Sequence, residues 1–248
     1  MKIEPKDLDL SGKRVLITGA ASGIGAAMAE TFSGHGADII LADRDVEGLK
    51  KKSQQTGASK IIEFDQAEKV SIDRLAGEAE PVDILLNNAG IVWMGPFVGM
   101  PPTEIERVIS INLVGPIHLA QNIGKSMLKA GAGVIVNTSS QLAFHGSAER
   151  AVYAATKAGI TQFTKSIAAE WAPKGVRVVA IAPGRTLTAI NAATLDSTYK
   201  QTEALKGIPI GRFAEAHEMA RLALLLSCDV LNYVVGETII SDGGYVLL

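Results

Sequence analysis

Strand-like and helix-like stretches alternate along almost the whole chain, and this alternation constrains the fold more than any other feature. Runs such as VDILL and GVIVN place apolar residues on both faces, as expected for strands of a parallel sheet that helices cover on both sides. Right-handed strand–helix–strand connections then predict a doubly wound α/β sheet, with its ligand at the carboxyl ends of the strands. We predict strands at 13–18, 38–42, 60–64, 83–86, 133–138, 176–181 and 237–241, and helices at 24–33, 45–54, 68–78, 103–129, 151–171 and 215–227.

No break in composition, repeat or low-complexity tract divides the chain, so residues 1–248 are predicted to form a single domain. One stretch, about 185–213, interrupts the alternation because it is long and polar and follows the sixth predicted strand. Connections of this length are usually functional or mobile. We interpret the segment as short helices that form a lid over the substrate, and a surface excursion without function is the alternative.

Charge and composition argue against several classes of partner. A net charge of −2, a pI of about 6.1 and 5% aromatic residues give no case for nucleic acid or an anionic membrane. The single cysteine, Cys228, lies in an apolar run and is predicted to be buried rather than reactive. The charged N-terminus lacks an apolar signal core, which favours a cytoplasmic protein. The four histidines are scattered, so no metal site is expected.

A cluster of glycines lies between the first predicted strand and the first predicted helix. The residues after 13–18 read GAASGIG and include Gly19, Gly23 and Gly25. In a strand-to-helix turn, glycines allow a tight bend and a close approach of the backbone to a pyrophosphate, which the helix N-terminus attracts. The spacing G-x-x-x-G-x-G differs from the common G-x-G-x-x-G. The cluster predicts a dinucleotide-binding turn, and a plain turn is the alternative.

The second predicted strand is followed by Asp43, eighteen residues after Gly25. A carboxylate at this place can accept hydrogen bonds from the adenosine ribose, and it would repel a 2′-phosphate. Asp43 therefore predicts NAD rather than NADP as the cofactor. Arg44 could turn towards a phosphate, whereas Ser22 adds no positive charge. An ordinary exposed acid in a turn is the alternative for Asp43.

Tyr153 and Lys157 occupy positions i and i+4 of the predicted helix 151–171, so their side chains share one face. A free phenol, with a pKa of about 10, is a poor acid or base at neutral pH, and a nearby ammonium would lower that pKa. Ser140 lies thirteen residues before Tyr153 and can hold a substrate oxygen beside the phenol. The three residues predict proton transfer to or from an alcohol, although the pair alone would also fit a solvated helix face.

These motifs occur together and in order: the glycine turn, Asp43, NNAG at 87–90, Asn112, Ser140, Tyr153 and Lys157. Together they resemble the short-chain dehydrogenase/reductase family, and the resemblance covers essentially the whole chain. TGAASGIG, NNAG, YAATK and IAPGRTLT carry it jointly. It implies a Rossmann-type fold and NAD-dependent exchange of a hydride with a secondary alcohol or ketone. Val179 and Val235 depart from residues frequent in the family, without touching the catalytic set.

The resemblance implies a role for each matching residue. Tyr153 would be the catalytic acid/base, and Lys157 would lower its pKa and bind the nicotinamide ribose. Ser140, preferred to Ser139 for its spacing to the tyrosine, would hold the substrate oxygen, and Asn112 would position a water for proton relay. The implied cofactor contacts are Gly19, Ser22, Gly23, Ile24, Gly25, Asp43, Asp65 (to the adenine amine), Asn87, Ala89, Tyr153, Lys157, Pro183 and Thr188.

The candidate substrate contacts are polar. Besides Ser140 they are Gln141, His145 and Arg150, and together they suggest a polyol, a sugar or a hydroxy acid as substrate. In relatives that act on short hydroxy acids, a basic residue at the place of Arg150 can meet the carboxylate, and a guanidinium suits a bidentate contact. A solvated arginine, or an ion pair near Glu149, is the alternative. His145 could equally be a surface histidine.

The leading hypothesis is an NAD-dependent secondary-alcohol dehydrogenase acting on a small molecule. A 3-oxoacyl reductase that uses NADPH and a non-catalytic protein that senses NAD are the alternatives, and the complete catalytic set argues against the latter. Small apolar positions on helices 151–171 and 215–227 suit packing against copies. Because members of the family are mostly dimers or tetramers, we expect a homotetramer.

Overall fold

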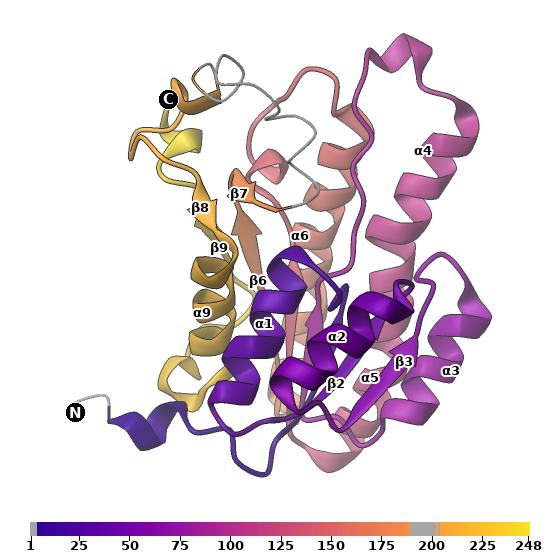
Figure 1. The fold of residues 1–248 in the computed structure, drawn as a ribbon, viewed down its shortest axis with the longest axis vertical. Helices are drawn as coiled ribbons and strands as arrows, with labels where there is room; N and C mark the ends of the chain where they lie inside the picture. Colours follow the sequence, from indigo (N-terminus) through magenta and orange to yellow (C-terminus); the bar gives the residue numbers. More distant parts are fainter. Residues whose placement is uncertain (1–3, 189–201, 203) are drawn as a thin grey trace.

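A seven-stranded parallel sheet forms the centre of the protein in a computed structural model that describes residues 4–188, 202 and 204–248 (Figure 1). The spatial order of the strands is β3-β2-β1-β4-β5-β6-β9. This confirms the predicted doubly wound sheet, and every predicted strand overlaps an observed one. The strands are β1 (Arg14–Thr18), β2 (Asp38–Asp43), β3 (Lys60–Glu63), β4 (Ile84–Asn87), β5 (Gly133–Thr138), β6 (Val176–Pro183) and β9 (Thr238–Ser241).

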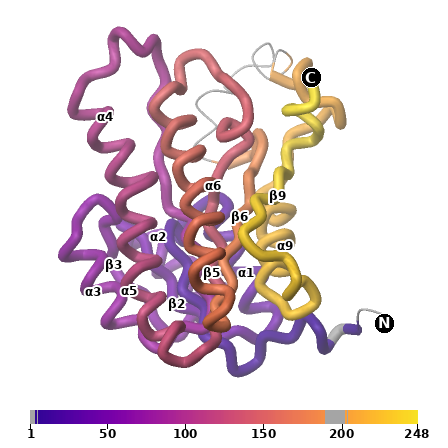
Figure 2. The backbone as a smooth tube through the Cα atoms, turned by 180° about the vertical axis from the view of Figure 1, so that it is seen from behind, coloured from indigo at the N-terminus to yellow at the C-terminus, as the bar shows by residue number. Residues whose placement is uncertain are grey.

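Helices cover both faces of the sheet. One face packs against α1 (Gly23–Gly34), α2 (Val46–Thr56) and α9 (Ala216–Ser227), which lie in front in Figure 1. The other face packs against α3 (Lys69–Ala79), α5 (Gly115–Ala130) and α6 (Ala151–Trp171), as the view from behind shows (Figure 2). Short 3-10 helices lie at Pro5–Leu8, Phe97–Gly99, Gln141–Ala143, Ala172–Lys174, Asp229–Leu231 and Tyr245–Leu247.

The central strands are apolar throughout because each contributes to two cores. In β1, Val15 and Ile17 belong to the cluster under α1 and α9, whereas Leu16 belongs to the cluster under α3, α5 and α6. All three are fully buried. Cys228, at the end of α9, is buried as well, as its apolar surroundings in the sequence predicted.

The helical pattern predicted at 103–129 is interrupted in the structure. Helix α4 (Pro102–Ile109) passes through a π-helical turn at Ser110–Val114 into α5. Pro116 explains part of this change, because proline has no N–H for the carbonyl of Asn112, four residues earlier, and its ring crowds that carbonyl. Turns of this kind are often found at functional sites, and Asn112 lies in the middle of this one.

The parallel strands place all their carboxyl ends on one edge of the sheet. The strand order changes direction at β1, whose neighbours are β2 on one side and β4 on the other. Ligands of open α/β sheets bind in the crevice outside such a point. The fold therefore directs the loops after β1, β2, β4, β5 and β6 to one region.

Two short strands, β7 (Thr186–Leu187) and β8 (Ala214–Glu215), pair near this edge. Thr186 lies opposite Ala214, so the two ends of the predicted lid segment lie side by side. The body of that segment, 189–201 and 203, lies outside the described residues, and its helices stay a prediction. Over the ranges the structure describes, no helix combines the length and apolarity needed to cross a membrane.

Candidate active site

A cleft of about 710 Å³ opens at the carboxyl ends of the strands. It extends from the glycine turn after β1 to Tyr245 near the C-terminus. The fold brings residues from distant parts of the chain to its surface. Of the predicted site residues, the following line it: Gly19, Ser22, Gly23, Ile24, Asp43, Asp65, Ala89, Ser140, Gln141, Arg150, Tyr153, Lys157, Pro183 and Thr188.

Four predicted residues do not line the cleft: Gly25, Asn87, Asn112 and His145. Asn87 is buried, and its Nδ2 donates to the Pro116 carbonyl at 2.9 Å and to Asn137 Oδ1 at 3.2 Å. We expected Asn87 to contact the cofactor, but in the structure its side chain links β4 to β5 and α5. His145 instead packs edge-on against the ring of Tyr245, with 5.3 Å between ring centroids.

The turn after β1 needs its glycines for steric reasons. A Cβ on Gly25 would lie 2.1 Å from the carbonyl oxygen of Gly19, and one on Gly19 would lie 2.9 Å from Cα of Ala89. Gly19 also has a φ of +68°, in the left-handed region that glycine adopts at low cost. Ser22, the N-cap of α1, makes no capping hydrogen bond with its side chain. The free amides at this helix start, beside a bare backbone, fit a pyrophosphate.

Asp43 lies at the end of β2, where it both lines the cleft and shapes the turn. Its Oδ2 accepts a hydrogen bond from the Ala21 amide at 3.1 Å, and its Oδ1 accepts one from the Asp45 amide at 3.0 Å. Arg44, beside it, lines the cleft too. The carboxylate is thus held at the place where the adenosine end of a dinucleotide would lie.

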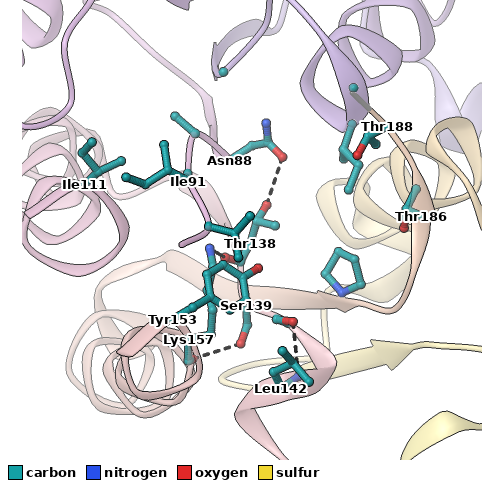
Figure 3. A pocket seen from close by; sticks show the side chains of 18 of the residues that line it. Asn88, Ile91, Ile111, Thr138, Ser139, Leu142, Tyr153, Lys157, Thr186 and Thr188 are labelled. Carbon is teal, nitrogen blue, oxygen red and sulfur yellow. Dashed lines mark hydrogen bonds between the residues drawn. The ribbon is translucent and has the colours of Figure 1, made fainter. Parts of the chain in front are cut away.

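Tyr153 and Lys157 extend from α6 into the cleft, side by side (Figure 3). The ammonium nitrogen of Lys157 lies 5.7 Å from the centroid of the Tyr153 ring. Lys157 Nζ donates to the carbonyl of Thr138, at the end of β5, at 2.8 Å. Position i and position i+4 of one helix therefore meet at the carboxyl end of the sheet, as the sequence spacing predicted.

The pKa of Tyr153 differs from the sequence expectation. Burial raises the pKa of the phenol above its usual value, whereas a hydrogen bond from Ser140 and the nearby Arg150 charge act to lower it. Lys157 is not among the groups that lower this pKa in the structure. The expectation of a net lowered pKa is therefore wrong, because the desolvation of the phenol outweighs the two groups that lower its pKa.

Desolvation also shifts the pKa of Lys157, but in the opposite direction from that of Tyr153. Its side chain is 4% exposed, and burial lowers the pKa of its ammonium to about 8. Burial penalises the charged form of each group, so the phenol pKa rises and the ammonium pKa falls. The two pKa values therefore move apart: the phenol of Tyr153 holds its proton more firmly than in water, and the ammonium of Lys157 releases its proton more readily.

The two adjacent serines after β5 have different surroundings. The hydroxyl of Ser139 donates to the Lys157 carbonyl at 3.0 Å and lies 2.7 Å from the Thr161 hydroxyl, so it ties β5 to α6. The hydroxyl of Ser140 accepts from the Leu142 amide at 3.2 Å and also hydrogen-bonds the Tyr153 phenol. Only Ser140 therefore shares a hydrogen bond with the phenol among the described contacts.

Asn112 is fully buried beneath the cleft. Its Oδ1 accepts from the Ile91 amide at 2.9 Å, and its Nδ2 donates to the Ile91 carbonyl at 2.7 Å. A Cβ on Gly90 would lie 3.2 Å from Asn112 Oδ1 and 3.5 Å from Lys157 Nζ, so asparagine and lysine flank the same glycine. The side chain of Asn112 thus fixes the loop after β4 next to the lysine.

Two residues that hold this loop were missed in the sequence. The side-chain Nδ2 of Asn88 donates to the Thr18 carbonyl at 3.0 Å. The Thr18 hydroxyl accepts from the backbone amides of Asn88 and Ala89, each at 3.0 Å. Gln66 Nε2 bridges the carbonyls of Ala89 at 3.0 Å and Ile111 at 2.6 Å. The NNAG motif signalled Asn88, but no local pattern singles out Gln66.

Two further lining residues, Arg185 and Tyr245, were not predicted as contacts. Arg185 lies within the IAPGRTLT segment, between the predicted contacts Pro183 and Thr188, so the sequence could have predicted it as a cleft residue. Tyr245 comes from the C-terminal 3-10 helix, which only the tertiary structure brings to the cleft.

The fold and this cleft define a class: an α/β protein with a glycine-rich dinucleotide turn beside a tyrosine, a lysine and a serine suited to proton transfer. A family model described as short chain dehydrogenase matches residues 13–198. The chain therefore belongs to the short-chain dehydrogenase/reductase family. It is an oxidoreductase with the nicotinamide dinucleotide-binding fold of that family.

Full-length relatives support this assignment. D-threitol dehydrogenase of Mycolicibacterium smegmatis is 37% identical, covering 97% of this chain and 95% of the relative. NAD-dependent glycerol dehydrogenase of Listeria innocua is 36% identical, covering 98% and 97%. The crystal structure of a putative NAD(P)-dependent gluconate 5-dehydrogenase from Beutenbergia cavernae, with bound NADP, superposes with a TM-score of 0.93 at 33% identity, covering 98% of this chain and 100% of that one.

Proposed function

We infer that the protein oxidises a secondary alcohol of a small polyol, sugar or hydroxy acid with NAD. The observation that carries this inference is the arrangement of Ser140, Tyr153 and Lys157 in one cleft with the glycine turn. Of these groups, the Tyr153 phenol would transfer the proton, and Ser140 and Lys157 would position and support it. The relatives named for threitol, glycerol and gluconate act on hydroxylated compounds, which supports the same substrate class.

The cofactor would be held mainly by the N-terminal half of the chain. The amides at the start of α1 would face the pyrophosphate, Asp43 the adenosine ribose, and Asp65 the adenine. Pro183 and Thr188, from the other wall, would meet the nicotinamide end. Bound there, the nicotinamide supplies the hydride acceptor or donor.

The residues of this chain would handle the proton. Ser140 would hold the substrate oxygen, and Tyr153 would take the hydroxyl proton during oxidation and return it during reduction. The ammonium of Lys157 would stabilise the phenolate. Both polar atoms of the Asn112 side chain hydrogen-bond the backbone of Ile91. The backbone carbonyl of Asn112 would therefore bind the relay water, because Pro116, four residues later, has no N–H to donate to that carbonyl.

Asp43 supports NAD over NADP, because a carboxylate would repel a 2′-phosphate. The bound NADP of the gluconate 5-dehydrogenase neighbour and the presence of Arg44 support the alternative. A 3-oxoacyl reductase using NADPH therefore stays the second enzyme hypothesis, and an NAD-sensing protein without catalysis stays the third. The NAD preference also favours oxidation as the physiological direction.

Three further properties are proposed on the family expectation and on the sequence. They are a homotetrameric assembly, a cytoplasmic location, and one domain over residues 1–248 with a substrate lid at about 185–213. Light scattering tests the first, and a monomer would contradict it.

The reaction is tested by screening polyols, sugars and hydroxy acids with NAD and with NADP. We expect NAD reduction with at least one compound, at a higher kcat/KM than with NADP. A higher kcat/KM with NADP would contradict the cofactor assignment. Binding of NADH without turnover of any alcohol or ketone would favour the sensing protein.

A further inference from the structure

We propose that Arg150 and Arg185 together bind a carboxylate of the substrate, so that the substrate is a hydroxy acid or oxo acid rather than a neutral polyol. This rests on the proposed function, because it names the substrate class of the same cleft. Both arginines line the cleft that contains Tyr153 and Ser140.

Arg150 is held at the start of α6 and makes no salt bridge with a described residue, although the charge of the exposed Glu149 acts to raise the pKa of its guanidinium. It is the N-cap of that helix and is half-buried. Its guanidinium donates to the Ser147 hydroxyl at 3.3 Å and lies 3.5 Å from the Met94 sulfur. Neither contact neutralises its charge, so the guanidinium keeps donors for a ligand.

The backbone before Arg150 is constrained. Glu149 has a φ of +63°, in the left-handed region, and it is the only such non-glycine residue in the part of the chain described. Its carbonyl accepts a hydrogen bond from the Gly95 amide at 3.1 Å. A costly backbone conformation held by a second loop is typical of residues that position a functional group.

Arg185 approaches the cleft from the other wall, directly after β6. Its carbonyl accepts from the Ala214 amide at 3.0 Å, which fixes its backbone at the base of the β7–β8 pair. Its Nε is buried and makes no hydrogen bond within the described structure. Asp242, which packs against Gly184, directs its carboxylate oxygens to the amides of Gly244 and Val246 instead.

The charges of the two arginines act on one another. Burial, and next the Arg185 charge, lower the pKa of Arg150. The acids that line the cleft are Asp43, the last residue of β2, and Asp65, just after β3, and both lie at the opposite end of the cleft from α6. A carboxylate between the two guanidiniums would remove their repulsion and satisfy the buried Nε.

The position of Arg150 also directs the reaction. Arg150, the N-cap of α6, and Tyr153 both line the cleft, and the Arg150 charge is near enough to lower the pKa of the Tyr153 phenol. A substrate whose carboxylate is held by Arg150 therefore extends past the Tyr153 hydroxyl. One of its carbinol carbons would then lie where Ser140 and Tyr153 can act.

The test uses pairs of probes that differ only at a terminal carboxylate: D-glycerate with glycerol, D-threonate with D-threitol, and D-gluconate with D-glucitol. Steady-state KM with NAD and calorimetric binding to the enzyme–NADH complex are measured for the wild type, Arg150→Met and Arg185→Met. Arg221→Met, on the exposed surface of α9, is the matched control. The Kd of NAD and the melting temperature are measured for every variant.

We expect at least one acid to bind about ten-fold or more tightly than its neutral partner in the wild type and in Arg221→Met. Each cleft variant should lose most of that preference while retaining its affinity for NAD. Equal or better binding of every neutral partner overturns the proposal, as does a preference that survives both substitutions. A loss of NAD affinity in Arg185→Met without loss of acid preference assigns that arginine to the cofactor and also overturns it.

The two proposals fail in different ways. If no probe is oxidised but an acid still binds with the arginine-dependent preference, the proposed reaction fails and the carboxylate site stands. If neutral alcohols are oxidised without any preference for acids, the reaction stands and the carboxylate site fails.

Discussion

The two ends of the cleft are built in different ways. At the cofactor end, the glycine turn after β1 presents its backbone to the cleft. It has no room for side chains, because a Cβ on Gly25 would lie 2.1 Å from the Gly19 carbonyl oxygen. At the substrate end, side chains from the loops after β5 and β6 and from the C-terminal helix meet: Ser140, Arg150, Arg185 and Tyr245. The backbone turn at the cofactor end fits the pyrophosphate, which all dinucleotides share. At the substrate end, a single side-chain substitution can change which substrate is bound.

This difference predicts that substitutions at the two ends will fail differently. Changes at the glycine turn should reduce cofactor affinity and stability together, because backbone must move. Changes at the substrate end should alter rate, pH dependence or substrate choice while the fold remains intact.

The largest effect is expected for Tyr153→Phe. Removing the hydroxyl that transfers the proton should lower kcat by about 10²–10⁴-fold, the range typical of a lost general acid or base. NADH binding, followed by fluorescence, should remain measurable. Tyr233→Phe, at a side chain that is 98% exposed, is the matched control and should keep normal turnover. Near-normal turnover of Tyr153→Phe would remove the central role of this phenol.

Lys157→Met tests the electrostatics of the pair by a stability measurement. The pKa of Lys157 is about 8 in the folded protein, against 10.5 for an ordinary lysine, so between these pH values the unfolded chain holds more protons. Wild-type stability should therefore rise relative to the variant from pH 8 to 10.5, by up to about 3 kcal/mol, and stay at a constant difference below pH 8. Denaturant unfolding at several pH values measures this difference.

Lys165→Met, on the exposed side of the same helix, is the control for that experiment. Its unfolding free energy should follow the wild type across the same pH range. A constant difference between wild type and Lys157→Met from pH 7 to 10.5 would show that burial does not depress the lysine pKa.

Gly25→Ala tests the backbone construction of the cofactor end. The new Cβ would lie 2.1 Å from the Gly19 carbonyl oxygen and 2.7 Å from Asn88 Nδ2. Overpacking of this kind costs about 1–3 kcal/mol, and we expect weaker NAD binding with it. Gly34→Ala, in the same helix with no atom within 4 Å of the new Cβ, should be neutral or slightly stabilising. Equal stability and equal NAD affinity of the two variants would contradict the steric role given to Gly25.

The smallest effect is expected for Ser140→Ala in the pH profile. The Ser140 hydrogen bond lowers the pKa of Tyr153, so its loss should raise that pKa. Oxidation needs the deprotonated phenol, and the rise of kcat/KM with pH should shift to higher pH. Ser139→Ala, which removes a bond between β5 and α6, should leave the profile in place and lower stability by about 1 kcal/mol.

Much of the site could be predicted because its motifs are local. The glycine turn, Asp43 and the Tyr153–Lys157 spacing each lie within one strand–turn–helix unit, where the chain itself sets the geometry. Asn87 shows the limit, because the same NNAG motif contains one residue that ties strands together and neighbours that line the cleft. Nothing in the local sequence separates these roles.

The sequence alone determined the layered α/β architecture and the family, because apolar periodicity and short motifs act through neighbours along the chain. The tertiary structure decided the direction of the Tyr153 pKa, the π-helical turn around Asn112, and the approach of Arg185 and Tyr245 to Arg150. Each of these depends on how densely distant segments pack around a group and which charges they bring near it. Desolvation and Coulomb energies depend on distance in space, which sequence separation does not specify.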